Sequence, residues 1–183
     1  MKFLFALLVW ALATCAHAVD LTPAQTAALK SAIIADANLA PQKATRDTQA
    51  IADYLNTASA FVVWKTTVSV DEVMRSGMDW TQVDNLSAGK ARIWDWMSRL
   101  GSFDCSKPTI RAGIDATWVG TSAALAVRAL VYTQCKRPST WFEKVFATGT
   151  GTDATPGLLV IEAPIDELTI RRLAWSDAGD WLL

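Results

Sequence analysis

Three glutamates near the end of the chain have the side-chain chemistry that glycoside hydrolysis requires. They are Glu143, Glu162 and Glu167. A glycosidase needs two carboxyl groups facing each other across a cleft, one as acid and one as base or nucleophile. The neighbouring residues favour a structural role, because Glu143 completes a helix start and the other two flank Pro164 as solvated charges.

Histidine-dependent chemistry is excluded by composition. The one histidine is His17, which lies in an N-terminal leader-like segment. Ser-His-Asp and Cys-His catalysis both need an imidazole to accept the proton of the nucleophile. A structural zinc site is also excluded in its usual form, because Cys105 and Cys135 supply only two ligands after the leader. We therefore expect no catalytic residues, no metal and no cofactor.

A loop rich in glycine and threonine, residues 148–157, is the remaining candidate for ligand chemistry. Phosphate-binding loops place glycines after a strand and before a helix, and the nucleotide triphosphatase type adds a lysine. Here the loop follows a helical pattern, precedes an apolar run and contains no lysine. We interpret it as a flexible hinge in which Gly149, Gly151 and Gly157 provide backbone freedom.

The charge of the chain is balanced, with 17 Lys and Arg against 18 Asp and Glu. The basic residues are scattered along the sequence. Nucleic acid is therefore not expected to be the main partner, because phosphate neutralisation needs a concentrated basic surface.

Residues 1–18 resemble an export signal, with a basic start, an apolar run and the small-x-small pattern Ala16-His17-Ala18. The apolar run is too short for a stable membrane span. The segment is either cleaved, retained in an assembly or the product of a mis-assigned start. Cys105 and Cys135 accordingly either form a disulfide in an exported chain or remain buried thiols in a cytoplasmic one.

The elements that position these residues are mainly helical. Capping signals and apolar spacing predict a compact helical bundle over residues 19–147, with a strand or extended connector at 60–70. Ser122 to Tyr132 should be the most buried helix. The expected helices lie at 22–36, 45–57, 69–77, 93–100, 108–118, 122–132 and 140–146, with a further one at 165–173.

The C-terminal part, residues 158–183, is predicted as a short β segment or extended arm followed by a docking tail. Leu158, Leu159, Val160 and Ile161 form an uninterrupted apolar run. A single strand cannot satisfy its own hydrogen bonds, so this run must pair with residues 61–67 or with a neighbouring subunit. The predicted subunit interface comprises Leu158, Leu159, Val160, Ile161, Ile165, Trp175 and Trp181.

Two stretches carry a resemblance to a known protein class: "LTPAQTAALKSAIIADANLA", residues 21–40, and "KRPSTWFEKVFATGTGTDATPGLLVIEAP", residues 136–164. From Leu21 to Pro164 the chain resembles small tailed-bacteriophage proteins encoded among the virion structural genes. It is also similar in plan to head-tail connector, or neck, adaptors. The resemblance implies a helical body whose extended segment reaches the next copy in a ring. The family proteins begin close to Leu21, so the leader departs from their pattern.

Two functions follow as hypotheses. The first is a non-enzymatic virion protein, a neck adaptor that forms a homo-oligomeric ring and contacts portal or tail components, assembled in the host cytoplasm. The alternative is an exported peptidoglycan hydrolase or wall-binding module that uses its carboxylates and exposed tryptophans, which would be periplasmic if the leader functions.

Overall fold

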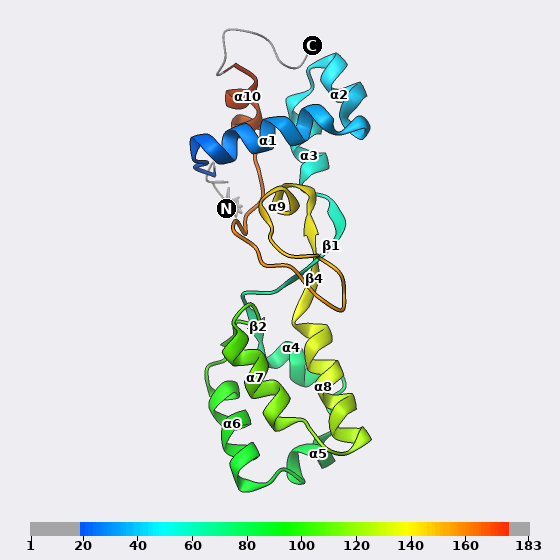
Figure 1. Cartoon of the computed structure of the whole chain (residues 1–183), viewed down its shortest axis with the longest axis vertical. Coiled ribbons are helices and arrows are strands. Elements are labelled where there is room, and N and C mark those ends of the chain that lie inside the picture. The colour runs from blue at the N-terminus through cyan, green and yellow to red at the C-terminus, as the bar shows by residue number, and fades with distance from the viewer. Residues whose placement is uncertain (1–18, 176–183) are drawn as a thin grey trace, which may run out of the picture.

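The computed structural model describes residues 19–175. The predictions for the leader, residues 1–18, and for Trp181 lie outside this range. The described chain is elongated, with two helical lobes joined by a two-stranded antiparallel ribbon (Figure 1). We call residues 19–57 and 141–175 the terminal lobe, and residues 65–135 the inserted lobe.

The terminal lobe packs its helices around a core that includes Leu29, Ile51 and Phe142. Its first helix begins where the sequence predicts, because Thr22 and Gln25 form both hydrogen bonds of a capping box. The elements of this lobe are α1 (Pro23–Ala35), the 3-10 helix η1 (Ala37–Leu39), α2 (Ala40–Thr45), α3 (Thr48–Leu55), α9 (Trp141–Phe146) and α10 (Glu167–Trp175).

Helix α2 lies between the helices predicted at 22–36 and 45–57. Proline sits in its first turn, where a missing N–H costs nothing. Lys43 extends back from α2 and its Nζ donates to the carbonyls of Ile33, Ile34 and Asp36 at 2.8–3.1 Å. The lysine thereby satisfies the last carbonyls of α1 and holds α2 against it.

The ribbon consists of β1 (Ala58–Trp64) and β4 (Lys136–Thr140), which run antiparallel with Val62 opposite Pro138. The strand predicted at 60–70 is thus formed only up to Trp64, and its partner is β4. Between the two strands, the hydroxyls of Ser59 and Ser139 are buried and 2.9 Å apart. This pair satisfies two polar groups that would otherwise be costly to bury.

The inserted lobe has its own core, in which Trp94 and Trp118 meet edge to face at 5.1 Å. The elements of the inserted lobe are β2 (Val68–Ser69), α4 (Val70–Arg75), α5 (Trp80–Asp84), α6 (Ala88–Arg99), β3 (Ser102–Phe103), α7 (Pro108–Thr117) and α8 (Ser122–Gln134).

Helix α8 is less buried than predicted, because only Val127 and Val131 of its residues are buried.

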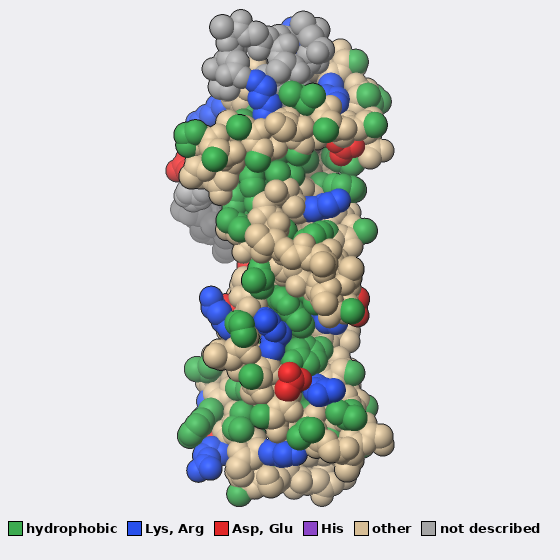
Figure 2. All heavy atoms as spheres, in the orientation of Figure 1, with side chains coloured by type: hydrophobic (Ala, Val, Ile, Leu, Met, Phe, Trp, Pro, Cys, Tyr) green, Lys and Arg blue, Asp and Glu red, His purple; other side chains and the backbone are tan. Residues whose placement is uncertain are grey.

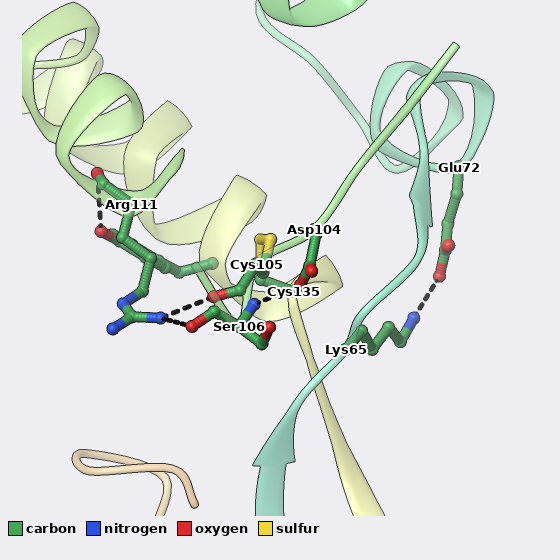
Figure 3. The surroundings of a disulfide bond; sticks show 8 residues. Lys65, Glu72, Asp104, Cys105, Ser106, Arg111 and Cys135 are labelled. Carbon is green, nitrogen blue, oxygen red and sulfur yellow. Dashed lines mark hydrogen bonds and ion pairs between the residues drawn. A yellow bond between two sulfur atoms is a disulfide. The ribbon is translucent and has the colours of Figure 1, made fainter. Parts of the chain in front are cut away.

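A disulfide joins Cys105 and Cys135 at the end of the inserted lobe that adjoins the ribbon (Figure 3). Both cysteines are fully buried. Beside the disulfide, Nη1 of Arg111 donates to the carbonyls of Cys105 and Ser106, and the amide of Lys65 donates to the carbonyl of Cys135 at 2.8 Å. The structure therefore adopts the paired form of the two alternatives left open by the sequence.

The mainly helical fold class is confirmed, but a compact single bundle is not. The helices surround two separate hydrophobic clusters, and only the ribbon and its associated loop lie between them (Figure 1). Sequence periodicity identifies the apolar face of each helix but not which helices share a core.

Candidate assembly surface

The glycine loop packs along the edge of β1 that faces away from β4. The amides of Val62 and Trp64 donate to the carbonyls of Gly151 and Gly157 at 2.7 and 3.1 Å, and the amide of Gly157 donates to Val62 at 2.9 Å. The ring of Phe61 fills the space beside Gly151 and Gly157, where a Cβ on either glycine would overlap it. The hinge role of these glycines stays a prediction, while their contacts provide a separate reason for glycine at both positions.

We expect Gly151→Ala to lower the free energy of unfolding by about 2 kcal/mol, because the new methyl group meets Phe61 and Gly151 has a φ of +67°. Urea unfolding of the purified protein measures this. Gly89→Ala is the matched control, because nothing lies within 4 Å of the new Cβ in α6. In the control, the free energy of unfolding should rise by about 0.5 kcal/mol. An equal decrease in the free energy of unfolding of both variants would contradict the packing role of Gly151.

Residues 158–164, which we call the arm, follow the loop. Exposure alternates along the arm, with even-numbered residues exposed and odd-numbered residues half-buried. Leu158 and Val160 are 42% and 61% exposed, whereas Ile161 packs against the core of the terminal lobe. The arm therefore has an inner face that holds it to the body and an outer face that is apolar.

Both ends of the arm are anchored by hydrogen bonds. Leu158 exchanges two backbone hydrogen bonds with Thr148, both at 2.9 Å. Just beyond the arm, the side-chain amide of Asn56 donates to the carbonyl of Ile165 at 2.8 Å and accepts from its amide at 2.9 Å. Between these anchors, residues 159–164 make no backbone hydrogen bond to any residue that the structure describes.

The strand predicted at residues 158–161 is not formed as a regular strand. Only isolated bridges occur, from Gly157 to Val63 and from Leu158 to Thr148, and the chain bends at Val160. The physical reason lies in β1, because one of its edges is occupied by β4 and the other by the glycine loop. The apolar run consequently has backbone groups that no residue of 19–175 pairs with.

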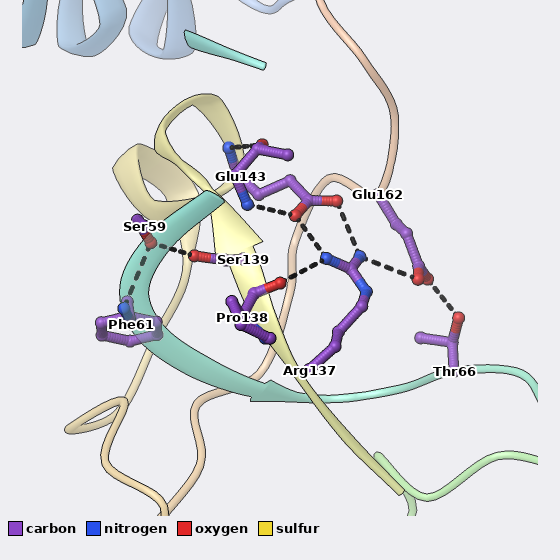
Figure 4. Close-up of polar contacts among 9 residues, drawn as sticks. Ser59, Phe61, Thr66, Arg137, Pro138, Ser139, Glu143 and Glu162 are labelled. Atoms are coloured by element: carbon purple, nitrogen blue, oxygen red, sulfur yellow. Dashed lines mark hydrogen bonds and ion pairs between the residues drawn. The ribbon is translucent and has the colours of Figure 1, made fainter. Parts of the chain in front are cut away.

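An ion-pair network fixes the arm to the ribbon (Figure 4). Arg137 binds Glu143 through two hydrogen bonds of 2.7 and 2.8 Å, and its Nη2 also donates to Glu162 of the arm at 3.1 Å. The hydroxyl of Thr66 donates to the other oxygen of Glu162. The guanidinium thus connects β4, α9 and the arm.

The three candidate carboxylates are each held by such contacts. Burial alone raises the pKa of Glu143, but hydrogen bonds from Arg137 and from the amide of Thr140 outweigh it and lower the pKa below its ordinary value. The hydrogen bond to Glu143 in turn raises the pKa of Arg137. Glu167 pairs with Arg171 and accepts from Thr48. A buried, ionised Glu143 whose oxygens are occupied is poorly suited to act as a general acid.

The predicted interface residues that the structure describes fall into four groups. Leu158 and Val160 are exposed, and Leu159 and Ile161 are half-buried. Ile165 is buried in its own subunit, so its side chain is not available at the surface. Trp175 is the last residue of α10.

Sequence reasoning missed Asn56, Phe61 and Arg137, which hold the loop and the arm. Their partners are distant in the sequence, and for Asn56 the separation is 109 residues. A signal was present only for Arg137, whose neighbour Glu143 completes the capping box with Thr140.

Among residues 19–175, no group of His, Cys, Asp and Glu is arranged to hold a metal ion. No helix in that range is long and apolar enough to cross a membrane. No family model, curated protein or solved structure matches the chain.

Proposed function

We propose that this protein is a non-enzymatic structural subunit of a tailed-phage virion, a head-tail connector adaptor that assembles into a ring through its arm. The observation that carries the proposal is the arm itself. It is anchored at both ends, exposes Leu158 and Val160, and has unpaired backbone groups at 159–164 within the described chain.

The proposed assembly depends on complementarity between neighbouring chains. An exposed extended segment with unpaired N–H and C=O groups can add to a neighbouring chain by backbone hydrogen bonds, while its alternate side chains fill apolar sites. A ring needs a heterologous contact, in which a segment of one copy binds a different surface of the next. The anchored arm limits the ordering cost of such a contact, since Arg137, Asn56 and Thr148 already hold it.

The exported-hydrolase alternative agrees with the Cys105–Cys135 disulfide, which is typical of an exported chain, but its proposed catalytic carboxylates are not arranged for hydrolysis. Its candidate acid Glu143 is bound at both oxygens by Arg137, and a guanidinium rather than an open cleft lies between Glu143 and Glu162. The resemblance of residues 21–164 to phage virion proteins supports the structural role and supplies the portal or tail components as further partners.

The arm can be tested by sedimentation of the purified full chain. Val160→Asp places a charge on the outer face, and we expect it to weaken self-association about a hundredfold. Val119→Asp is the matched control, because Val119 is also an exposed valine, at 48%, but lies in the inserted lobe, just after the C-cap of α7. Equal assembly of wild type and both variants would overturn the role of the arm.

The virion assignment has a separate test. Mass spectrometry of purified particles of the phage that encodes the chain should detect the protein in several copies per particle. Its absence from particles would remove the adaptor role. N-terminal sequencing of the native protein from infected cells distinguishes cytoplasmic assembly from export, because cleavage after Ala18 would indicate export.

A further inference from the structure

An apolar groove opens on the surface of the terminal lobe between α1 and α9. Its volume is about 490 Å³. Figure 2 shows hydrophobic side chains gathered there, with a basic side chain beside them. The groove is lined by Ala28, Ala32, Ala35, Asp36, Leu39, Leu55, Trp141, Lys144 and Val145.

The floor of the groove is formed by residues of the hydrophobic core. Leu39 and Leu55 are buried at its base. Trp141 forms one side, and its ring stacks on Tyr54 at 5.8 Å between ring centres. Alanine side chains of α1 form the opposite side, so the groove is kept open by small residues packed on a fixed core.

One cation lies at the edge of this groove. Nζ of Lys144 lies 4.4 Å from the centre of the Trp141 ring, and within the described chain it forms no ion pair. The carboxylate at the other edge, Asp36, already accepts hydrogen bonds from Tyr54 and Asn38. The groove therefore presents an apolar floor and an ammonium without a carboxylate partner.

The outer face of the arm has the matching pattern. Leu158, Val160 and Glu162 are its successive exposed residues, which gives two apolar side chains followed by an acid. Glu162 accepts one hydrogen bond on each oxygen, so it retains capacity to accept another. No residue of the arm lines the groove of its own chain.

We infer that this groove receives the arm of a second copy of the chain. Leu158 and Val160 of one copy fill the apolar floor, and Glu162 pairs with Lys144 of the next copy. This inference rests on the proposed self-assembly and names the acceptor surface that the proposal leaves open. Because donor and acceptor are different surfaces of one subunit, each copy uses both, as a ring requires.

The test uses full-length variants that each damage one side of the contact. Ala32→Trp fills the groove but keeps the arm, whereas Val160→Asp damages the arm but keeps the groove. Neither variant alone should assemble. Mixed in equal amounts, they should form a complex of two subunits and no larger one, because only the arm of the first and the groove of the second remain functional. Mass photometry distinguishes these species.

A second variant tests the groove independently, in case Ala32→Trp does not fold. Lys144→Glu reverses the charge at the edge, and we expect it to weaken assembly about fivefold. It should lower the unfolding midpoint only slightly, through loss of the contact between Lys144 and the Trp141 ring. If Val160→Asp prevents assembly while Ala32→Trp and Lys144→Glu assemble as wild type does, the groove is not the acceptor and the arm keeps its proposed role. If the wild type does not self-associate, the proposed assembly fails together with this inference.

Discussion

Replacing Glu143 with glutamine is expected to lower the free energy of unfolding by about 3 kcal/mol at pH 7. Glu143 is 4% exposed and accepts two hydrogen bonds from Arg137 and one from the amide of Thr140. The neutral amide removes the charge from a buried pair and leaves a guanidinium with only Glu162 as its ionic partner. The change also weakens the link between α9 and the arm.

The pH dependence provides a specific check. The pKa of Glu143 is lowered in the folded state from an ordinary value of 4.5. Its contribution to stability is therefore complete above about pH 4.5 and is lost as the pH falls through the lower, folded value. The stability difference between wild type and Glu143→Gln should shrink on acidification from pH 7 to pH 3, as measured by urea unfolding.

Glu72→Gln is the matched control for this experiment. Glu72 also pairs with a single cation, Lys65, but its side chain is 40% exposed. Its loss should cost about 0.5 kcal/mol, the range of exposed ion pairs. If Glu143→Gln is equally mild and its effect does not vary with pH, the network is not the stabilising contact that the structure indicates.

Removing the disulfide is the second large perturbation. We expect the double variant Cys105→Ala and Cys135→Ala to lose about 3 kcal/mol, because the bond closes a segment with a sequence separation of 30 residues and limits the unfolded chain. Hydrogen exchange should increase mainly in α7 and α8, which border the disulfide, and little in α1 and α9 of the other lobe.

The measurement needs two comparisons. Peptide mapping without reductant should recover the peptides of Cys105 and Cys135 linked, and reductant should destabilise the wild type but not the double variant. Insensitivity of the wild type to reductant would contradict the structural role of the bond. Disulfides are typical of oxidising compartments, so the redox state in protein isolated from cells also reports where the chain folds.

The sequence predicts local structure well where the signal is local. Thr22 with Gln25, Ser69 with Glu72 and Thr140 with Glu143 mark three helix starts, and each of these threonine or serine side chains caps its helix in the structure. Gly101 follows the C-cap residue of α6 and has a φ of +72°, the left-handed conformation in which glycine commonly ends a helix. These features depend on residues three or four apart, which is the range that periodicity and capping rules describe.

The division into two lobes could not be predicted in the same way. Whether α1 shares a core with α9 or with α8 depends on the pairing of β1 with β4, which are separated by more than 70 residues. For the candidate surface, the apolar run at 158–161 was visible in the sequence. The lack of backbone partners for this run within the described chain could not be seen in the sequence. It arises because β4 and the glycine loop occupy the two edges of β1.

The ribbon brings together the two points at which the inserted lobe joins the rest of the chain. The chain enters and leaves the inserted lobe at neighbouring positions, since Trp64 pairs with Lys136 and the amide of Lys65 bonds to Cys135. Residues 65–135 therefore behave as a cassette whose two junctions already meet. A tight two-residue turn or a foreign domain could replace the cassette. The arm would lose the hydrogen bond from Thr66 to Glu162 but keep its anchors at Thr148, Asn56 and Arg137. The length of the molecule can thus be changed at the ribbon while the core of the terminal lobe stays the same.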